Sequence, residues 1–160
     1  MTTSPLEVQY GGSTPTVRQL SVFLENRVGA LLRLTQIFDA TDIRILAVSV
    51  IEAVDCAVCR LLVDDADKAY KVLSDNEFAS SQAELLIVSL PHGRRALLHT
   101  LAALLGGEVN IRYTYPLLIR PRGAAALAVC TDDIDQAARV LRERKYVLLD
   151  EEDLLAEREH

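Results

Sequence analysis

The chain contains an internal repeat. Residues from about 20 to 73 are echoed from about 86 to 141, and a shift of 66 positions places Leu24 on Leu90 and Ile45 on Ile111. Further along the shift becomes 68, because the second copy carries two additional residues near positions 120–123. A period of this length is too long for a solenoid repeat. The sequence therefore predicts two small domains of the same fold in one chain.

Each copy shows the same order of hydrophobic patterns. Alternating apolar residues predict strands, and apolar residues at helical spacing predict amphipathic helices. The order in each copy is βαββαβ, which predicts an α+β protein made of two ferredoxin-like units side by side, each with an antiparallel sheet and both helices on one face. The predicted elements are 19–25, 31–38, 43–51, 56–63, 66–73 and 78–81, and then 85–90, 95–105, 109–119, 124–130, 134–144 and 146–149.

The repeat also predicts the domain organisation. We expect domain 1 at residues 17–82 and domain 2 at residues 83–150, with almost no linker, so that the last strand of one runs nearly directly into the first strand of the next. The segment 1–16 is polar and rich in turn residues, and we expect it to be flexible. Residues 151–160 are expected to form a solvated acidic tail.

Several residue clusters have simpler interpretations than catalysis or metal binding. The acidic pairs Asp64-Asp65 and Asp132-Asp133 precede predicted helices, where a side-chain oxygen can cap free amides, and neither lies in a calcium-binding loop. Cys56 and Cys59 have the spacing of a metal or redox pair, yet residues three apart on a strand point to opposite faces. We predict free thiols, no metal, no cofactor and no enzymatic activity.

The apolar residues predict a core and an interface. The helix residues expected to pack on the sheets are Leu31, Leu34 and Phe38 in the first copy, with Leu97, Leu101 and Leu104 in the second. Apolar side chains such as Leu85 and Leu86 fill both faces of the predicted strands. An uncovered apolar face of that size favours homodimerisation through the sheets, or binding to an enzyme subunit.

Composition excludes some classes of function. Half of the residues are apolar and a quarter are charged, with a net charge of −6. An acidic protein without aromatic residues on the central strands at 56–63 and 124–130 is poorly suited to nucleic acid, although the RNA recognition fold shares the βαββαβ order. No apolar run reaches the length of a membrane helix, so we expect no membrane association and a cytoplasmic location.

The segment SVFLENRVGALLRLTQIFDATDIRI resembles the opening strand, glycine loop and first helix of an ACT domain. That family senses small molecules and regulates enzymes of amino-acid metabolism. Its loop commonly reads asparagine-arginine-proline-glycine, and here it is Asn26-Arg27-Val28-Gly29, with valine in place of proline. Both copies resemble the family. The resemblance implies a regulatory protein that binds a free amino acid and acts in trans on a metabolic enzyme.

The resemblance also implies a composite ligand site. In side-by-side ACT pairs the ligand lies between the loop of one domain and the start of the second strand of the other. The complete site then combines two sets of residues, which are Asn26, Arg27, Val28, Gly29 and Ala30 from the first copy and Asn110 and Ile111 from the second. The reciprocal site is degraded at His92, Gly93, Arg94, Arg95 and Arg44.

Three alternatives remain open from the residues. The protein is a stand-alone sensor, or it is the regulatory subunit of a biosynthetic enzyme such as acetolactate synthase. A small ferredoxin-like enzyme needs a cleft with convergent titratable groups, for which the sequence offers only scattered histidines such as His92 and His99. We therefore favour the sensor, with one amino acid bound per chain.

Overall fold

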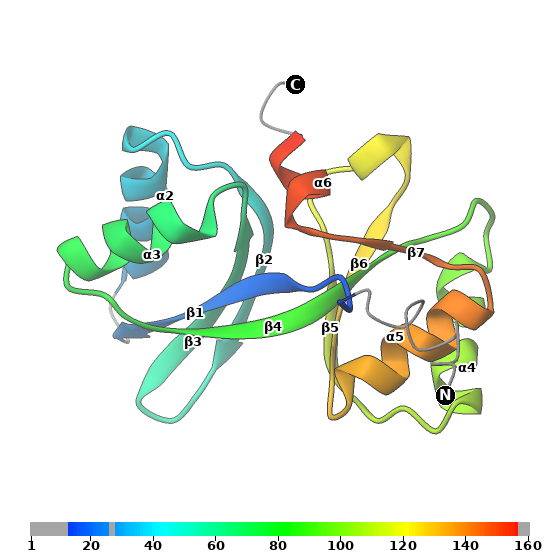
Figure 1. Cartoon of the computed structure of the whole chain (residues 1–160). Coiled ribbons are helices and arrows are strands. Elements are labelled where there is room, and N and C mark those ends of the chain that lie inside the picture. The colour runs from blue at the N-terminus through cyan, green and yellow to red at the C-terminus, as the bar shows by residue number, and fades with distance from the viewer. Residues whose placement is uncertain (1–12, 26–27, 157–160) are drawn as a thin grey trace, which may run out of the picture.

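The computed structural model describes residues 13–25 and 28–156 and confirms the predicted α+β fold (Figure 1). The first unit contains β1 (Val17–Glu25), α2 (Ala30–Ala40), β2 (Ile45–Glu52), β3 (Cys56–Val63), α3 (Ala66–Asp75) and the first part of β4 (Ala79–Ser89). The second contains the rest of β4, α4 (Ala96–Gly106), β5 (Ile111–Pro116), the short 3₁₀ turn η1 (Pro121–Gly123), β6 (Ala126–Thr131), α5 (Ile134–Glu143) and β7 (Val147–Leu149), and α6 (Glu151–Leu155) follows.

One strand serves both units. The strand β4 pairs antiparallel with β1 from Ala79 to Leu85, and with β6 from Leu86 to Ser89. The strand order is β2-β3-β1-β4-β6-β5, and β7 also pairs with β4. The helices α2 and α3 lie at one end of the molecule and α4 and α5 at the other, each pair covering one unit's sheet (Figure 1).

The helix-side cores differ in part from the prediction. Leu34, Phe38 and Leu104 are fully buried, as predicted. The prediction was wrong for Leu31 and Leu97, whose exposed fractions are 39% and 47%. Both lie in the first turn or so of their helices.

The composition of α4 explains why the prediction for Leu97 was wrong. It buries Thr100 and Ala103 together with Leu104, and the Thr100 hydroxyl donates to the carbonyl of Ala96 at 2.8 Å. The Thr100 hydroxyl is thus satisfied inside the helix. Leucines occur on nearly every side of α4, so their spacing alone does not determine which side faces the sheet.

The sheet surfaces away from the helices pack on each other. A third core lies between the units and contains Leu46 and Leu62 of the first, Ala128 and Leu149 of the second, and Ile87 of the shared strand. At its edge the guanidinium of Arg60 lies 3.6 Å from the ring centroid of Tyr113. The apolar face that was expected to require a second chain is therefore largely covered within one chain. This removes the original argument for dimerisation through the sheets.

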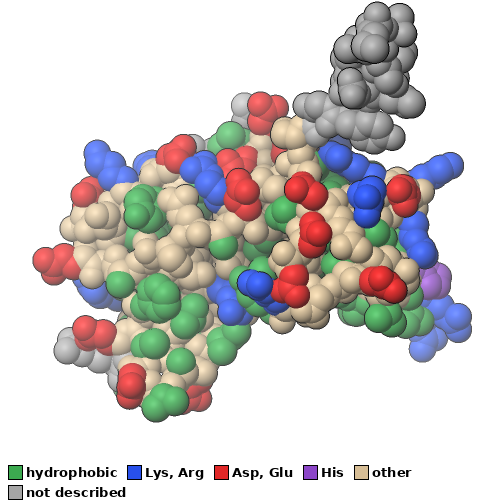
Figure 2. Space-filling view, turned by 60° about the horizontal axis from the view of Figure 1, so that its bottom comes forward, with side chains coloured by type: hydrophobic (Ala, Val, Ile, Leu, Met, Phe, Trp, Pro, Cys, Tyr) green, Lys and Arg blue, Asp and Glu red, His purple; other side chains and the backbone are tan. Residues whose placement is uncertain are grey.

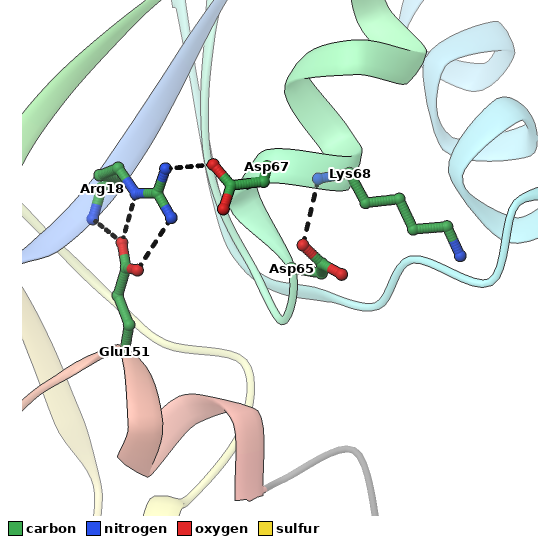
Figure 3. A network of polar contacts seen from close by, with 5 residues as sticks. All are labelled: Arg18, Asp65, Asp67, Lys68 and Glu151. Atoms are coloured by element: carbon green, nitrogen blue, oxygen red, sulfur yellow. Dashed lines mark hydrogen bonds and ion pairs between the residues drawn. The ribbon is translucent and has the colours of Figure 1, made fainter.

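The acidic C-terminal segment is not a solvated extension over its described part. Asp150 and Asp153 form a reciprocal capping box that starts α6, and Leu154 is buried in the core between the units. Arg18 of β1 donates to Glu151 at 2.7 Å and to Asp67 at 2.6 Å (Figure 3). The segment thus fastens the second unit to the first.

Local predictions about acidic pairs and cysteines agree with the structure. Asp65 accepts a hydrogen bond from the backbone N–H of Lys68, and Asp133 accepts one from Gln136, so both aspartates cap helices. The described cysteines are free thiols. Burial raises the pKa of Cys59 to about 11, which keeps this thiol protonated at neutral pH.

The expectation of a flexible segment at residues 1–16 falls mostly on residues 1–12, which lie outside the described part of the chain. Within residues 13–25 and 28–156, none of the helices has the length and apolar character needed to cross a bilayer.

Candidate functional site

A cavity of about 590 Å³ opens beside the turn from β1 to α2. It is lined by residues 23–25 and 28–30 with Arg33, by residues 55–56 of the β2–β3 hairpin, and by residues 76–79 between α3 and β4. These segments are far apart in the sequence and all belong to the first unit. The volume lies in the range of small-molecule sites.

The turn into α2 depends on Gly29. Its φ angle is +88°, a left-handed conformation that side chains disfavour, while the space around its α-carbon is open. The first helical hydrogen bond runs from the N–H of Arg33 to the carbonyl of Gly29 at 2.9 Å. The amides of residues 30–32 precede that bond, so this helix end favours an anion.

Arg33 connects the helix to the opposite wall. Its guanidinium carbon lies 4.8 Å from the ring centroid of Phe78, and one of its nitrogens donates to the carbonyl of Asn76 at 3.5 Å. Asn76 is itself fixed, because its side-chain amide donates to the carbonyl of Val72 at 2.8 Å. A guanidinium has five donors, so Arg33 can bind a carboxylate in addition to these contacts.

The remaining wall is acidic and apolar. Glu25, Asp55 and Glu77 contribute carboxyl groups, and Phe23 contributes an exposed aromatic ring. Carboxylates suit an ammonium group, whereas Arg33 and the helix end suit a carboxylate. The cavity can therefore bind both charged groups of one small zwitterion, with an apolar part against the aromatic rings.

The predicted residues of the first loop are divided between described and undescribed positions. Val28, Gly29 and Ala30 line the cavity. Asn26 and Arg27 lie outside the described residues.

The second half of the predicted composite site lies elsewhere. The side-chain amide of Asn110 donates to Asp132, which also accepts from Arg112. The pKa of Asp132 is lowered, first by the hydrogen bond from Asn110 and then by the one from Arg112. Asn110 and Ile111 are not among the described residues that line the cavity. The composite arrangement remains a prediction.

The loop of the second unit has a different backbone. Gly93 has a φ angle of +121°, and Arg95, at the repeat position of Gly29, is the residue before the first turn of α4, with a φ angle of −101° and no capping hydrogen bond from its side chain. His92, Gly93, Arg94 and Arg95 are all exposed. The strand position Arg44 has a backbone N–H that donates to a carboxyl oxygen of Asp64 at 3.1 Å.

Several residues of the cavity were not identified from the sequence, among them Arg33, Asp55, Asn76 and Phe78. The pattern placed Arg33 on the outer side of its helix and Phe78 at the start of a strand, and both placements are compatible with the structure. The signal that could have indicated the wall at Phe78 is Asn76, the residue that ends α3, which is followed by Glu77 with a φ angle of +62°. That turn brings Phe78 back toward α2.

Comparisons with known proteins give a consistent result. The family model described as an ACT domain pair matches residues 15–157. The crystal structure of protein BT0572 from Bacteroides thetaiotaomicron is similar over 89% of this chain and 99% of that chain, with 33% identity and a TM-score of 0.80. A search among curated proteins gave no significant match.

More distant structures share the fold. The ligand-free regulatory subunit of aspartate kinase from Thermus thermophilus has a TM-score of 0.57 at 12% identity, over 82% of this chain and 93% of that chain. The corresponding subunit from Thermus flavus has a TM-score of 0.53 at 11% identity with the same coverage.

Proposed function

Since the chain belongs to the family of ACT domain pairs, we propose that it is a regulatory protein that binds a free amino acid in the cavity beside Gly29. ACT domains are regulatory, ligand-binding modules, and the match extends over both units. In this role the chain performs no catalytic step and acts as a cytoplasmic sensor.

The observation that carries this proposal is the arrangement of charges around the cavity. Arg33 and the start of α2 line the cavity together with two acidic residues, Asp55 of the hairpin and Glu77 of the turn before β4. An amino acid has a carboxylate for the first set and an ammonium group for the second. Phe23 and Phe78 then contact the side chain of the amino acid, which favours an amino acid with an apolar side chain.

The proposed output is regulation in trans of a metabolic enzyme. Two proteins with the same fold are described as regulatory subunits of aspartate kinase, which supports a separate regulatory chain as a use of this fold. The alternative is a regulatory subunit of a biosynthetic enzyme such as acetolactate synthase. Co-purification from the native host, with and without the ligand, distinguishes a sensor that acts alone from a permanent subunit.

The ligand is identified by thermal-shift screening against the common amino acids and then measured by calorimetry. A ligand that binds only the folded state raises its melting temperature with concentration. Arg33→Met is expected to weaken binding about tenfold or more, because a hydrogen bond to a charged group contributes about 1.5–3 kcal/mol. Arg139→Met, at an exposed position on α5, is the matched control and should bind normally.

Two further variants decide between the cavity and the composite site. If the first unit alone forms the site, Asn110→Ala binds as wild type. If Asn110 completes the site, Asn110→Ala loses binding while His92→Ala does not. Both versions predict about one amino acid per chain, so two equivalent sites per chain would contradict the proposal.

A further inference from the structure

The short helix α6 lies across the junction of the two units. Its Leu154 is fully buried in the core between them, whereas Leu155 is 43% exposed. The helix has five residues, and an isolated helix of that length is not stable in water. Its stability therefore comes from its contacts with the two units.

The backbone of this segment is not part of a sheet. The strand pairing of β7 with β4 ends at Leu149. Among the described residues, the backbone N–H groups at positions 150–156 bond within that segment, as from Leu154 to the carbonyl of Asp150 at 3.3 Å. The side chains of α6 hold it in place, so it can move away without breaking a strand pairing.

Two arginines, one from each unit, bind carboxyl groups of α6. Arg18 of β1 donates to Glu151 from its guanidinium at 2.7 and 3.0 Å and from its backbone N–H at 3.1 Å (Figure 3). Arg122 of η1 donates to Asp153. The side chains of Arg18 and Arg122 are 29% and 67% exposed, so water and salt reach both ion pairs. Salt screens such exposed pairs and weakens them.

The packing around α6 is incomplete. A cavity of about 130 Å³ lies between α6 and the start of α3, and Val17, Val63 and Leu154 are among the residues that line it. A second cavity, of about 420 Å³, is lined by residues 13–16 and 150–152 together with Arg18. Protein interiors are normally close-packed, so a helix bordered by two cavities makes few apolar contacts for its length.

We propose that α6 is a salt-sensitive clasp, which separates from the two units as one piece while both units remain folded. Release breaks the ion pairs of Arg18 and Arg122, exposes Leu154, and leaves the second unit less firmly connected to the first. Local opening of this kind occurs where a segment is held by few buried apolar contacts and by exposed polar ones. The ligand cavity is lined by other residues, so this proposal and the proposed amino-acid binding can fail separately.

Hydrogen exchange of the full chain, followed by backbone amide NMR, tests the clasp. The hydrogen-bonded amides of Asp153, Leu154 and Ala156 are expected to exchange about tenfold or more faster than those of β1, and faster still as salt is added. The amides of β1 and β6 are the reference in the same sample, because their strand pairings persist while both units are folded.

Matched variants separate α6 from other effects of salt. Figure 2 shows acidic and basic side chains intermixed over the surface, so salt also acts on charges that do not contact α6. Arg18→Met and Arg122→Met should each accelerate the three amides severalfold at low salt and reduce their dependence on salt. Arg139→Met, at an exposed position on α5, should leave both the rates and their salt dependence unchanged.

The pattern of acceleration decides the outcome. Release as one piece requires the amides of Asp153, Leu154 and Ala156 to accelerate by the same factor. Acceleration of Ala156 alone would mean that the helix only frays at its end, and this would overturn the proposal. Protection of α6 equal to that of β1 would overturn it too, as would equal acceleration of α6, β1 and β6 in Arg18→Met, because the units would then unfold together with the helix.

Discussion

The hydroxyl of Tyr115 donates a 2.6 Å hydrogen bond to the side-chain oxygen of Gln19, and this bond joins a strand of the second unit to a strand of the first. The amide nitrogen of the same glutamine donates to the hydroxyl of Tyr113 at 2.8 Å. Gln19 is buried, and burial also raises the pKa of Tyr115, so that its hydroxyl remains a donor through neutral pH. The two units are therefore connected by a satisfied polar contact inside an apolar interface.

We predict that Tyr115→Phe lowers the free energy of unfolding by about 1–3 kcal/mol, because it leaves the buried oxygen of Gln19 without that donor. Urea denaturation of the two proteins measures the difference. Tyr70→Phe, at an exposed position on α3, should have a negligible effect. Equal losses in both variants would mean that the contact between the units contributes nothing beyond the aromatic ring.

The contact between Arg18 and Glu151 predicts a dependence of stability on pH. The hydrogen bond from Arg18 lowers the pKa of Glu151 below its ordinary value of 4.5. A carboxyl whose pKa is lower in the folded state stabilises that state above its unfolded pKa, and the stabilisation is lost as the pH falls through the folded pKa. The contribution of Glu151 should thus be complete at neutral pH and decline below about 4.5.

Glu151→Gln is accordingly expected to cost about 1 kcal/mol at neutral pH, since the pair is partly exposed and solvent screens it. The difference from wild type should shrink as the solution is acidified. Glu152→Gln, on the exposed neighbouring residue, is the control and should leave the pH profile unchanged. A difference for Glu151→Gln that stays constant from neutral to strongly acidic pH would contradict the prediction.

The helix α2 offers a comparison of two leucines in the same helix. Leu34 is fully buried against the first sheet, and Leu32 lies on the solvent side. Leu34→Ala should lower the free energy of unfolding by about 2–5 kcal/mol, because it leaves a cavity in the core. Leu32→Ala makes the same chemical change and should cost well under 1 kcal/mol. Similar losses in chemical denaturation would show that the helix packs in another phase.

Features that depend on neighbouring residues could be predicted from the sequence. The alternation around Leu20 and Leu24 predicts β1, and Asp65 and Asp133 predict the starts of α3 and α5, because strands and caps follow from local geometry. The repeat extended each assignment from one unit to the other.

Features that depend on distant contacts could not be predicted in this way. The phase of α4 is set by Thr100 and Ala103 against the second sheet, although leucines surround the helix. The segment after Asp150 reads as acidic and solvated, yet Leu154 packs between the units and Glu151 reaches Arg18. The cavity unites Arg33, Asp55 and Phe78, which no sequence spacing connects.

A free amino acid is proposed to bind in the cavity beside Gly29. The most direct measurement is a titration of the full chain with each common amino acid, followed by backbone amide NMR. We predict that one of them saturates at one per chain and shifts the amides of Gly29, Arg33 and Phe78. Arg33→Met should bind it about tenfold more weakly, so that the shifts of Gly29 and Phe78 are strongly reduced at a concentration that half-saturates wild type. Shifts confined to His92 and Arg95, or no response to any amino acid, would contradict the account.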